Sequence, residues 1–166
     1  MLSFFTTEKA RSVADLGCGM GSYVRLFCKA GLAATGFDGN PATPRLSKGM
    51  CSVLDLSVVA HVDTPYDWVM SLEVGEHLPK QHEGAFIENL HNHNTRGVVL
   101  SWALQGQGGT GHVNEQNNDY IKARMAAKGY VNDVAAERTL RDAARFTYFK
   151  KTVMVFRRPG QEAEGS

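Results

Sequence analysis

Short apolar segments alternate with amphipathic segments along almost the whole chain, and this alternation constrains the fold more than any other feature. The apolar segments end at glycine or acidic residues, as buried strands do. The amphipathic segments carry apolar residues three and four positions apart, which is typical of helices packed on a sheet. Strands alternating with helices predict an α/β fold with a mostly parallel sheet. We expect strands over 11–16, 33–38, 52–55, 66–74, 97–103, 130–134 and 151–158, and helices over 22–30, 80–91, 114–128 and 140–148.

The composition fits one globular domain. Of the 166 residues, 43% are hydrophobic and 21% are charged, and the net charge is +1. We divide the chain into a short N-terminal extension (1–10), a domain (11–158) and a polar tail (159–166) that we expect to be disordered. No apolar run approaches the ~18 residues of a membrane span, and no secretory signal is present. Three cysteines without a pairing pattern fit a reducing compartment, so we expect a cytoplasmic protein with no membrane partner.

A glycine-rich turn follows the first expected strand. Gly17, Gly19 and Gly21 recur at every second position after Asp15, which permits a tight turn and close approach of a ligand to the backbone. A dinucleotide-binding fingerprint would need glycine where this chain has Ser22. The carboxylate of Asp15 would repel a pyrophosphate but would suit a ligand with an ammonium or sulfonium group. A purely structural turn is the alternative.

The sequence VADLGCGMGSYV resembles the first motif of class I S-adenosylmethionine-dependent methyltransferases, and further motifs follow in order. In GFDGNP, Asp38 stands where this family binds the ribose hydroxyls, and in VLDLS, Asp55 stands where it reads the adenine amino group, with Leu56 beside the ring. The resemblance implies a three-layer, Rossmann-like α/β fold: a seven-stranded sheet, mostly parallel with an antiparallel last strand, with helices on both faces. It also implies S-adenosylmethionine as cofactor. The implied cofactor-binding residues are Asp15, Gly17, Cys18, Gly19, Gly21, Asp38, Gly39, Asn40, Asp55, Leu56 and Glu73.

The segment Glu73-Val-Gly-Glu76-His77 places two carboxylates and an imidazole within five residues. If the chain coils after the fourth strand, these side chains share one face, and such a donor set suits Mg²⁺, Mn²⁺, Fe²⁺ or Zn²⁺. The pattern is similar to that of metal-dependent O-methyltransferases that act on small-RNA 3′ ends or in the ubiquinone pathway. The RNA enzymes use a further downstream histidine, for which His112 is the candidate. Three roles stay open for Glu73, Glu76 and His77: metal binding, catalysis with His77 as a metal-free general base, and a structural role.

Two features concern access to the site. Few residues precede the first strand, so the N-terminal helices that often cover substrate in this family are largely missing. We therefore expect an open site, or one completed by a second copy of the chain in a homodimer or by a partner subunit. The glycine-rich loop 106–111 is a candidate lid, and Trp102 is either a stacking platform or a core residue.

The predicted activity is methyl transfer from S-adenosylmethionine to a small-molecule acceptor, at oxygen and with possible help from a divalent cation. A nucleic-acid partner is not expected, because the chain lacks a strongly basic surface. The alternatives are an RNA 2′-O-methyltransferase and a cofactor-binding regulatory subunit without catalysis. A nicotinamide oxidoreductase is more distant, because Asp15 and Ser22 disfavour a dinucleotide.

Overall fold

The computed structural model describes residues 1–160, so residues 161–166 of the expected disordered tail lie outside the described part. Its centre is one seven-stranded sheet with strand order β3-β2-β1-β4-β5-β7-β6. The first five strands run parallel, and β7 runs antiparallel to both of its neighbours. This confirms the predicted fold class. The strands are β1 (Ser12–Leu16), β2 (Ala33–Asp38), β3 (Cys51–Val53), β4 (Tyr66–Leu72), β5 (Asn94–Ser101), β6 (Val131–Asn132) and β7 (Met154–Arg157).

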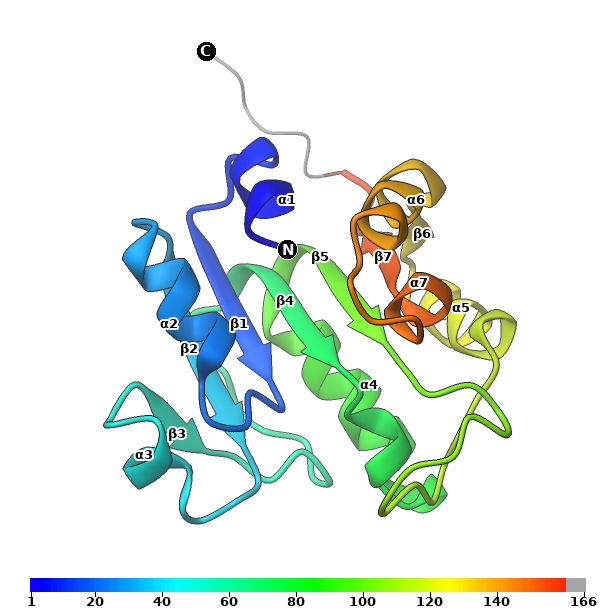
Figure 1. Cartoon of the computed structure of the whole chain (residues 1–166), viewed down its shortest axis with the longest axis horizontal. Coiled ribbons are helices and arrows are strands. Elements are labelled where there is room, and N and C mark those ends of the chain that lie inside the picture. The colour runs from blue at the N-terminus through cyan, green and yellow to red at the C-terminus, as the bar shows by residue number, and fades with distance from the viewer. Residues whose placement is uncertain (161–166) are drawn as a thin grey trace.

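Helices cover both faces of the sheet (Figure 1). On one face lie α1 (Leu2–Thr7), α2 (Ser22–Lys29), α6 (Val134–Asp142) and α7 (Phe149–Thr152), and on the other lie α4 (Glu83–Asn92) and α5 (Asn118–Ala126). Three short turns complete the structure: α3 (Thr43–Leu46), η1 (Gly75–His77) and η2 (Lys80–His82). Each strand divides its residues between two cores, because side chains alternate along a strand. Val13 packs with Phe27 beneath the first group of helices, whereas Ala14 packs with Phe86 beneath the second.

The segment before β1 is part of the packed structure. Phe5 on α1 is fully buried and makes edge-to-face contacts with Phe27 and Trp68. The Glu8 carboxylate accepts two hydrogen bonds of 2.7 Å from the Arg157 guanidinium, which joins the start of the chain to the last strand. The short N-terminal segment 1–10 therefore packs on the sheet.

Two helix expectations near the C-terminal end are wrong. The expected helix over 140–148 is replaced by α6, which starts at Val134 because the Asp133 carboxylate caps it by accepting the Ala136 N–H at 2.9 Å. This capping residue also shortens β6 to two residues. The helix expected from residue 114 begins only at Asn118, because the Gln116 N–H bonds the Ala103 carbonyl instead.

The topology positions the functional site. In the sheet, β1 and β4 are neighbours, and the connections on either side of this pair lie on opposite faces. Ligands bind such sheets beyond the carboxyl ends of the strands, at this point of the topology. The glycine turn follows β1, Asp38 ends β2, and Glu73 follows β4 at this edge. Among residues 1–160, no helix is long and apolar enough to cross a membrane.

Candidate functional site

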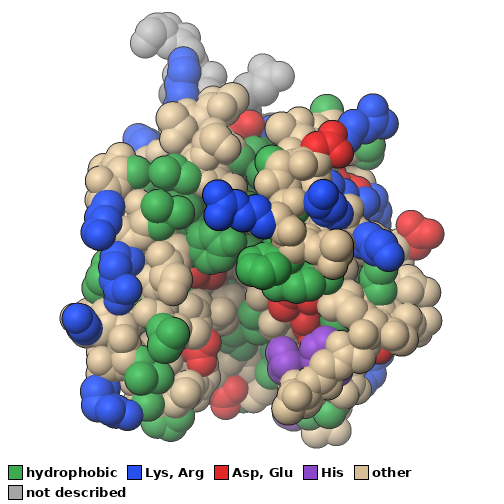
Figure 2. All heavy atoms as spheres, viewed as in Figure 1, with side chains coloured by type: hydrophobic (Ala, Val, Ile, Leu, Met, Phe, Trp, Pro, Cys, Tyr) green, Lys and Arg blue, Asp and Glu red, His purple; other side chains and the backbone are tan. Residues whose placement is uncertain are grey.

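A cavity of about 300 Å³ opens at the carboxyl ends of β1, β2 and β4. Six of the predicted cofactor residues line it, together with His77: they are Gly17, Asp38, Gly39, Asp55, Leu56 and Glu73. Three carboxylates thus face one small space, and no Lys or Arg is among the described residues that line it. On this face of the molecule, acidic and histidine side chains surround a hollow (Figure 2). An anionic ligand would be repelled here, whereas a cationic one would be attracted.

The backbone N–H groups of the glycine turn form hydrogen bonds within the protein. Gly17, Gly19 and Gly21 have φ of 85°, 54° and 73°, a conformation that favours glycine. The N–H groups of Gly17 and Cys18 both donate to the Phe37 carbonyl, at 2.7 and 3.0 Å, and that of Gly21 donates to the Cys18 carbonyl at 2.9 Å. The turn therefore does not offer the row of free N–H groups with which a phosphate-binding loop holds its ligand.

Asp38 connects the end of β2 to this turn. One carboxylate oxygen accepts the Gly19 N–H at 2.8 Å and the other accepts the Asn40 N–H at 2.9 Å. Each oxygen keeps a second lone pair for a ligand. Cys18 is half-buried and its thiol lies beside that of Cys51, in the space left free because position 36 is glycine. The Cys18 side chain thus supports the turn from behind.

Asp15 lies beneath the turn and is almost completely buried. Burial raises its pKa to about 7, and the nearby negative charge of Asp38 adds to the shift. Asp55 behaves differently, because it is exposed and hydrogen bonds from Ser57 keep its pKa below the usual range. Leu56 beside it is buried and forms an apolar wall of the cavity.

Glu76, His77 and His112 come together as a potential cation site. One carboxylate oxygen of Glu76 and one nitrogen of each histidine lie within 4.8 Å of one another. The two imidazole rings meet edge to face at 5.0 Å. His112 Nδ1 lies 2.9 Å from a Glu115 oxygen and His77 Nδ1 lies 3.2 Å from the Gly111 carbonyl, so both rings are oriented by a second contact. Such outer contacts are typical of metal-binding histidines.

The Glu76 carboxylate itself is unusual. It is fully buried, and neither oxygen has a hydrogen-bond partner among the described residues. Burial raises its pKa to about 7; the backbone N–H groups of Glu76 and Ala103 oppose this shift without meeting hydrogen-bond geometry. A buried carboxylate without partners is costly unless a proton or a cation compensates it.

Glu73 does not join this group, contrary to the expectation of one shared face. Its φ is 55°, so the chain turns sharply between β4 and η1 and the helical spacing from Glu73 to Glu76 is lost. Its carboxylate instead accepts hydrogen bonds from Gln107 at 2.9 Å and from Thr152 at 3.2 Å. Nothing in the local sequence signals these two partners, because they come from distant loops.

The first half of the glycine-rich loop after β5 is bonded to Glu115, which follows the loop. The Glu115 carboxylate accepts the N–H groups of Gly106 and Gly108, each at 2.7 Å. Trp102 at its start is fully buried in the core, with its indole N–H bonded to the Asn114 carbonyl at 2.6 Å. Trp102 is therefore a core residue and no stacking platform. Glu115 was not predicted from sequence, since an acidic residue in a polar stretch carries no signal of its own.

Solved structures with bound cofactor share this architecture. The chain is similar to magnesium protoporphyrin IX methyltransferase from Synechocystis PCC 6803 with bound S-adenosylhomocysteine, with 20% identity, a TM-score of 0.72, and coverage of 95% of this chain and 80% of that one. The chain has the fold of the class I S-adenosylmethionine-dependent methyltransferases.

Two further methyltransferases support this assignment of the fold. An amino pentose methyltransferase from Micromonospora echinaspora matches with 15% identity and a TM-score of 0.70, over 95% of this chain and 88% of that one. The methyltransferase domain of bacterial CtHen1 matches with 20% identity and a TM-score of 0.66, over 95% and 94%. No family model and no curated protein matches the sequence.

Proposed function

We propose that the chain is an S-adenosylmethionine-dependent methyltransferase that methylates an oxygen of a small-molecule acceptor. The observation that carries this proposal is the acidic cavity beside a glycine turn whose N–H groups at Gly17, Cys18, Gly19 and Gly21 are already bonded within the protein. S-adenosylmethionine carries a sulfonium and an ammonium group, which suit such a cavity, whereas the pyrophosphate of a nicotinamide dinucleotide does not.

The roles of the lining residues follow from their chemistry. The turn from Gly17 to Gly21 would bind the methionine part, with Asp15 as the negative charge nearest its ammonium group. Asp38 would accept hydrogen bonds from the ribose hydroxyls, and Asp55 from the adenine amino group. Leu56 would pack on the adenine ring. When bound, S-adenosylmethionine supplies a methyl group activated by the positive sulfur.

The acceptor side of the reaction belongs to the residues after β4. The acceptor oxygen bonds to the methyl carbon as the carbon–sulfur bond breaks, and the electron pair of that bond neutralises the sulfonium. The proton of the acceptor hydroxyl must leave to a base. The two candidate bases are Glu76, whose pKa burial raises to about 7, and His77, whose imidazole lies at the cavity wall.

Glu76, His77 and His112 also fit a divalent cation. The fit rests on the unpartnered, buried carboxylate of Glu76 and on two histidines whose rings are oriented by other contacts. A carboxylate with two imidazoles suits Mn²⁺, Fe²⁺ or Zn²⁺, and Mg²⁺ with added waters. A cation there would lower the pKa of an alcohol oxygen and orient it.

RNA 2′-O-methylation is the second candidate function. It is favoured by the position of His112, which joins Glu76 and His77 as the resemblance to small-RNA methyltransferases anticipates, and by the likeness to the CtHen1 domain. The acidic cavity and the net charge of +1 argue for a small acceptor over a polyanion. Strong, salt-dependent binding of an oligoribonucleotide would reverse this preference.

Titration calorimetry with S-adenosylmethionine tests the proposed function. We expect binding of S-adenosylmethionine and S-adenosylhomocysteine, and no binding of NAD⁺ at the same concentrations. Methyl transfer by the isolated chain to any acceptor would exclude a purely regulatory role and a need for a different partner subunit. We also propose a cytoplasmic location, supported by three cysteines that are free of disulfides within the described residues.

A further inference from the structure

The segment 145–149 between α6 and α7 presents aromatic side chains that the proposed cofactor site does not use. Phe146 is 59% exposed and Tyr148 36% exposed, although both are large and apolar. Their rings stack at 5.4 Å with an angle of 14° between the planes, and Tyr148 contacts Phe149 at 4.5 Å. A stacked, solvent-exposed aromatic pair next to a functional site is typical of a ligand-binding surface.

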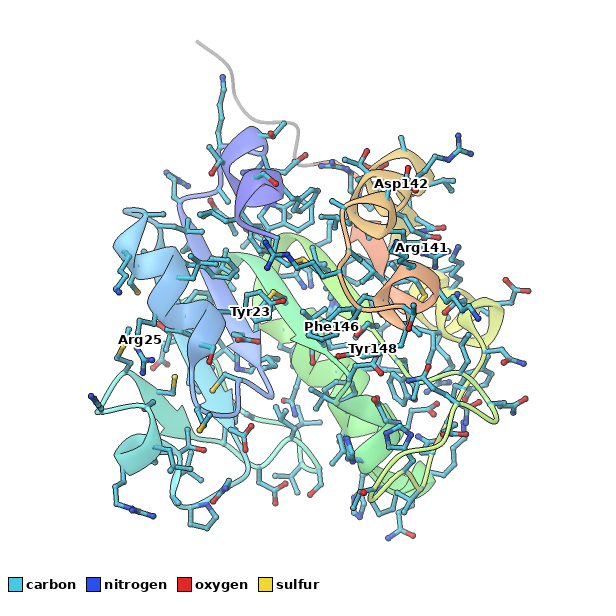
Figure 3. All side chains as sticks on the ribbon, in the orientation of Figure 1. Tyr23, Arg25, Arg141, Asp142, Phe146 and Tyr148 are labelled. Atoms are coloured by element: carbon cyan, nitrogen blue, oxygen red, sulfur yellow. The ribbon has the colours of Figure 1, made fainter. Side chains whose placement is uncertain are left out.

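These rings stand between two cavities. Phe146 lines a cavity of about 460 Å³ between α1, α2 and α6, which we call the apolar cavity, and Tyr23 and Leu140 line it too. Tyr148 lines a cavity of about 380 Å³ beside the glycine-rich loop, which we call the polar cavity, together with Gln107 and Lys151. Both volumes lie within the range of small-molecule sites. Figure 3 shows Tyr23, Phe146 and Tyr148 gathered in the middle of one face.

The 300 Å³ cavity beyond β1, β2 and β4, which we call the cofactor cavity, adjoins the polar cavity at Glu73. This carboxylate lines the cofactor cavity and accepts a hydrogen bond from Gln107 of the polar cavity. Its other oxygen lies 3.2 Å from the hydroxyl of Thr152, and the Tyr148 carbonyl lies 3.0 Å from the same hydroxyl, so the two acceptors share one donor hydrogen. The backbone of Tyr148 therefore contacts, through Thr152, the residue that follows β4, where the methyl group would be transferred.

Two cations flank the rings. Arg145 lines the apolar cavity and Lys151 the polar cavity, and neither side chain forms an ion pair or hydrogen bond within residues 1–160. The cofactor cavity, by contrast, is lined by carboxylates alone among charged groups, apart from His77. A ligand that lies on the aromatic rings therefore meets positive charge at its outer end and the proposed transfer site at its inner end.

We propose that the methyl acceptor is a flat aromatic molecule with an anionic group, held by Phe146 and Tyr148 with Lys151 or Arg145 at its acidic end. This inference rests on the proposed function and adds the class of acceptor. The acceptor hydroxyl would reach past Glu73 toward Glu76 and His77, where its proton leaves as the carbon–oxygen bond forms and the carbon–sulfur bond breaks. The exposed aromatic pair supplies stacking, and the cations supply the orientation.

Binding of 6-hydroxy-2-naphthoate, a flat probe with a hydroxyl at one end and a carboxylate at the other, tests the proposal by calorimetry on the full chain. We expect Phe146→Ala and Tyr148→Ala each to weaken this binding about fivefold, because each removes one stacking partner. Lys151→Met should weaken it by a similar factor and should weaken 2-naphthol, which lacks the carboxylate, much less. Val131→Ala, at an exposed position on β6 that lines neither cavity, is the matched control and should leave it unchanged.

Three outcomes would overturn the proposal. They are no binding of the naphthoate, binding of the naphthoate by the Phe146 and Tyr148 variants as tight as by the wild type, and binding of cyclohexanecarboxylate as tight as that of the naphthoate. An oligoribonucleotide that binds tightly through Phe146 and Tyr148 while the naphthoate does not would replace it by an RNA acceptor. S-adenosylmethionine binding is measured on the same samples. Its failure counts against the proposed function, whereas its success with no aromatic binding counts against this inference alone.

Discussion

The Glu73 carboxylate accepts a hydrogen bond of 3.2 Å from the hydroxyl of Thr152, a residue 79 positions away in sequence. Glu73 follows the central strand β4, and Thr152 ends the short helix α7, so this contact joins the cofactor cavity to the aromatic segment. The same hydroxyl lies 3.0 Å from the carbonyl of Tyr148, which shares its one hydrogen with Glu73. One buried threonine therefore positions groups on both sides of the proposed transfer site.

Thr152→Val should lower the free energy of unfolding by about 1 kcal/mol, because Val keeps the shape but removes the hydroxyl that Glu73 and the Tyr148 carbonyl share as donor. It should also weaken binding of 6-hydroxy-2-naphthoate while leaving that of S-adenosylmethionine nearly unchanged. Urea unfolding and calorimetry measure the two effects. The control is Thr6→Val on α1, where the hydroxyl bonds only a carbonyl of its own helix; equal effects of the two variants would contradict the positioning role.

The affinity for S-adenosylmethionine should rise with pH around neutrality. Burial and Asp38 raise the pKa of Asp15 to about 7, and the ligand's ammonium group prefers the ionised carboxylate. Between pH 6 and 7.5 we expect up to about a tenfold gain in affinity. Asp15→Asn should bind S-adenosylmethionine weakly, and its affinity should change little with pH. Asp142→Asn, at an exposed position in the last turn of α6, should behave as the wild type. An unchanged pH profile in Asp15→Asn would assign the dependence to another group.

The buried Glu76 carboxylate should make stability fall as pH rises. Its folded-state pKa of about 7 exceeds its ordinary value of 4.5. Between these two pH values the folded chain keeps Glu76 protonated while the unfolded chain has lost that proton. The contribution of Glu76 to the free energy of unfolding is therefore full below pH 4.5 and is lost as pH rises through about 7. Glu76→Gln removes the charge and should stabilise the metal-free protein at pH 8 by on the order of 2 kcal/mol. Chemical unfolding at pH 5 and pH 8 in EDTA measures the difference.

A divalent cation should offset the destabilisation that the ionised Glu76 carboxylate causes at pH 8 in the wild type. Millimolar MnCl₂ at pH 8 should raise the melting temperature of the wild type and leave that of Glu76→Gln and His112→Ala unchanged. His61→Ala, which lacks any role at the site, is the control, since His61 contacts only Asp63 at the surface. A wild type indifferent to Mn²⁺, Mg²⁺, Fe²⁺ and Zn²⁺ would leave Glu76 and His77 as metal-free acid–base groups.

Gly36→Ala should destabilise the protein through the packing behind the glycine turn. A Cβ at this position would lie 2.6 Å from the Cys51 sulfur and 2.8 Å from both the Cys18 sulfur and a Val24 methyl group. We expect a loss of about 1–3 kcal/mol, because overpacking forces these buried groups apart. Gly84→Ala on α4 is the control, since a Cβ there meets nothing within 4 Å and should be neutral or stabilising. Thermal unfolding of both variants measures the contrast.

The sequence predicted the sheet and which residues meet in the cavity at its carboxyl edge, because both depend on local patterns. Strand positions follow from apolar runs, and Gly17, Asp38 and Asp55 meet because parallel strands end at one edge. Boundaries near the C-terminus failed where a single capping residue, Asp133, decided where a helix starts.

The acceptor side was less predictable. The positive φ of Glu73 breaks the helical spacing, and no sequence pattern signals it at a residue other than glycine. Gln107, Glu115 and Thr152 contribute through contacts between distant loops. The grouping of Glu76, His77 and His112, by contrast, was anticipated by the resemblance to metal-dependent enzymes.

We infer that the turn from Asp15 to Gly21 binds an adenosyl amino acid and no phosphate. The decisive experiment is a crystal structure of the chain soaked with saturating S-adenosylhomocysteine. We predict density with the ribose at Asp38, the adenine between Asp55 and Leu56, and the amino group toward Asp15. An empty crevice at saturating ligand, or the nucleoside bound elsewhere on the chain, would contradict the account.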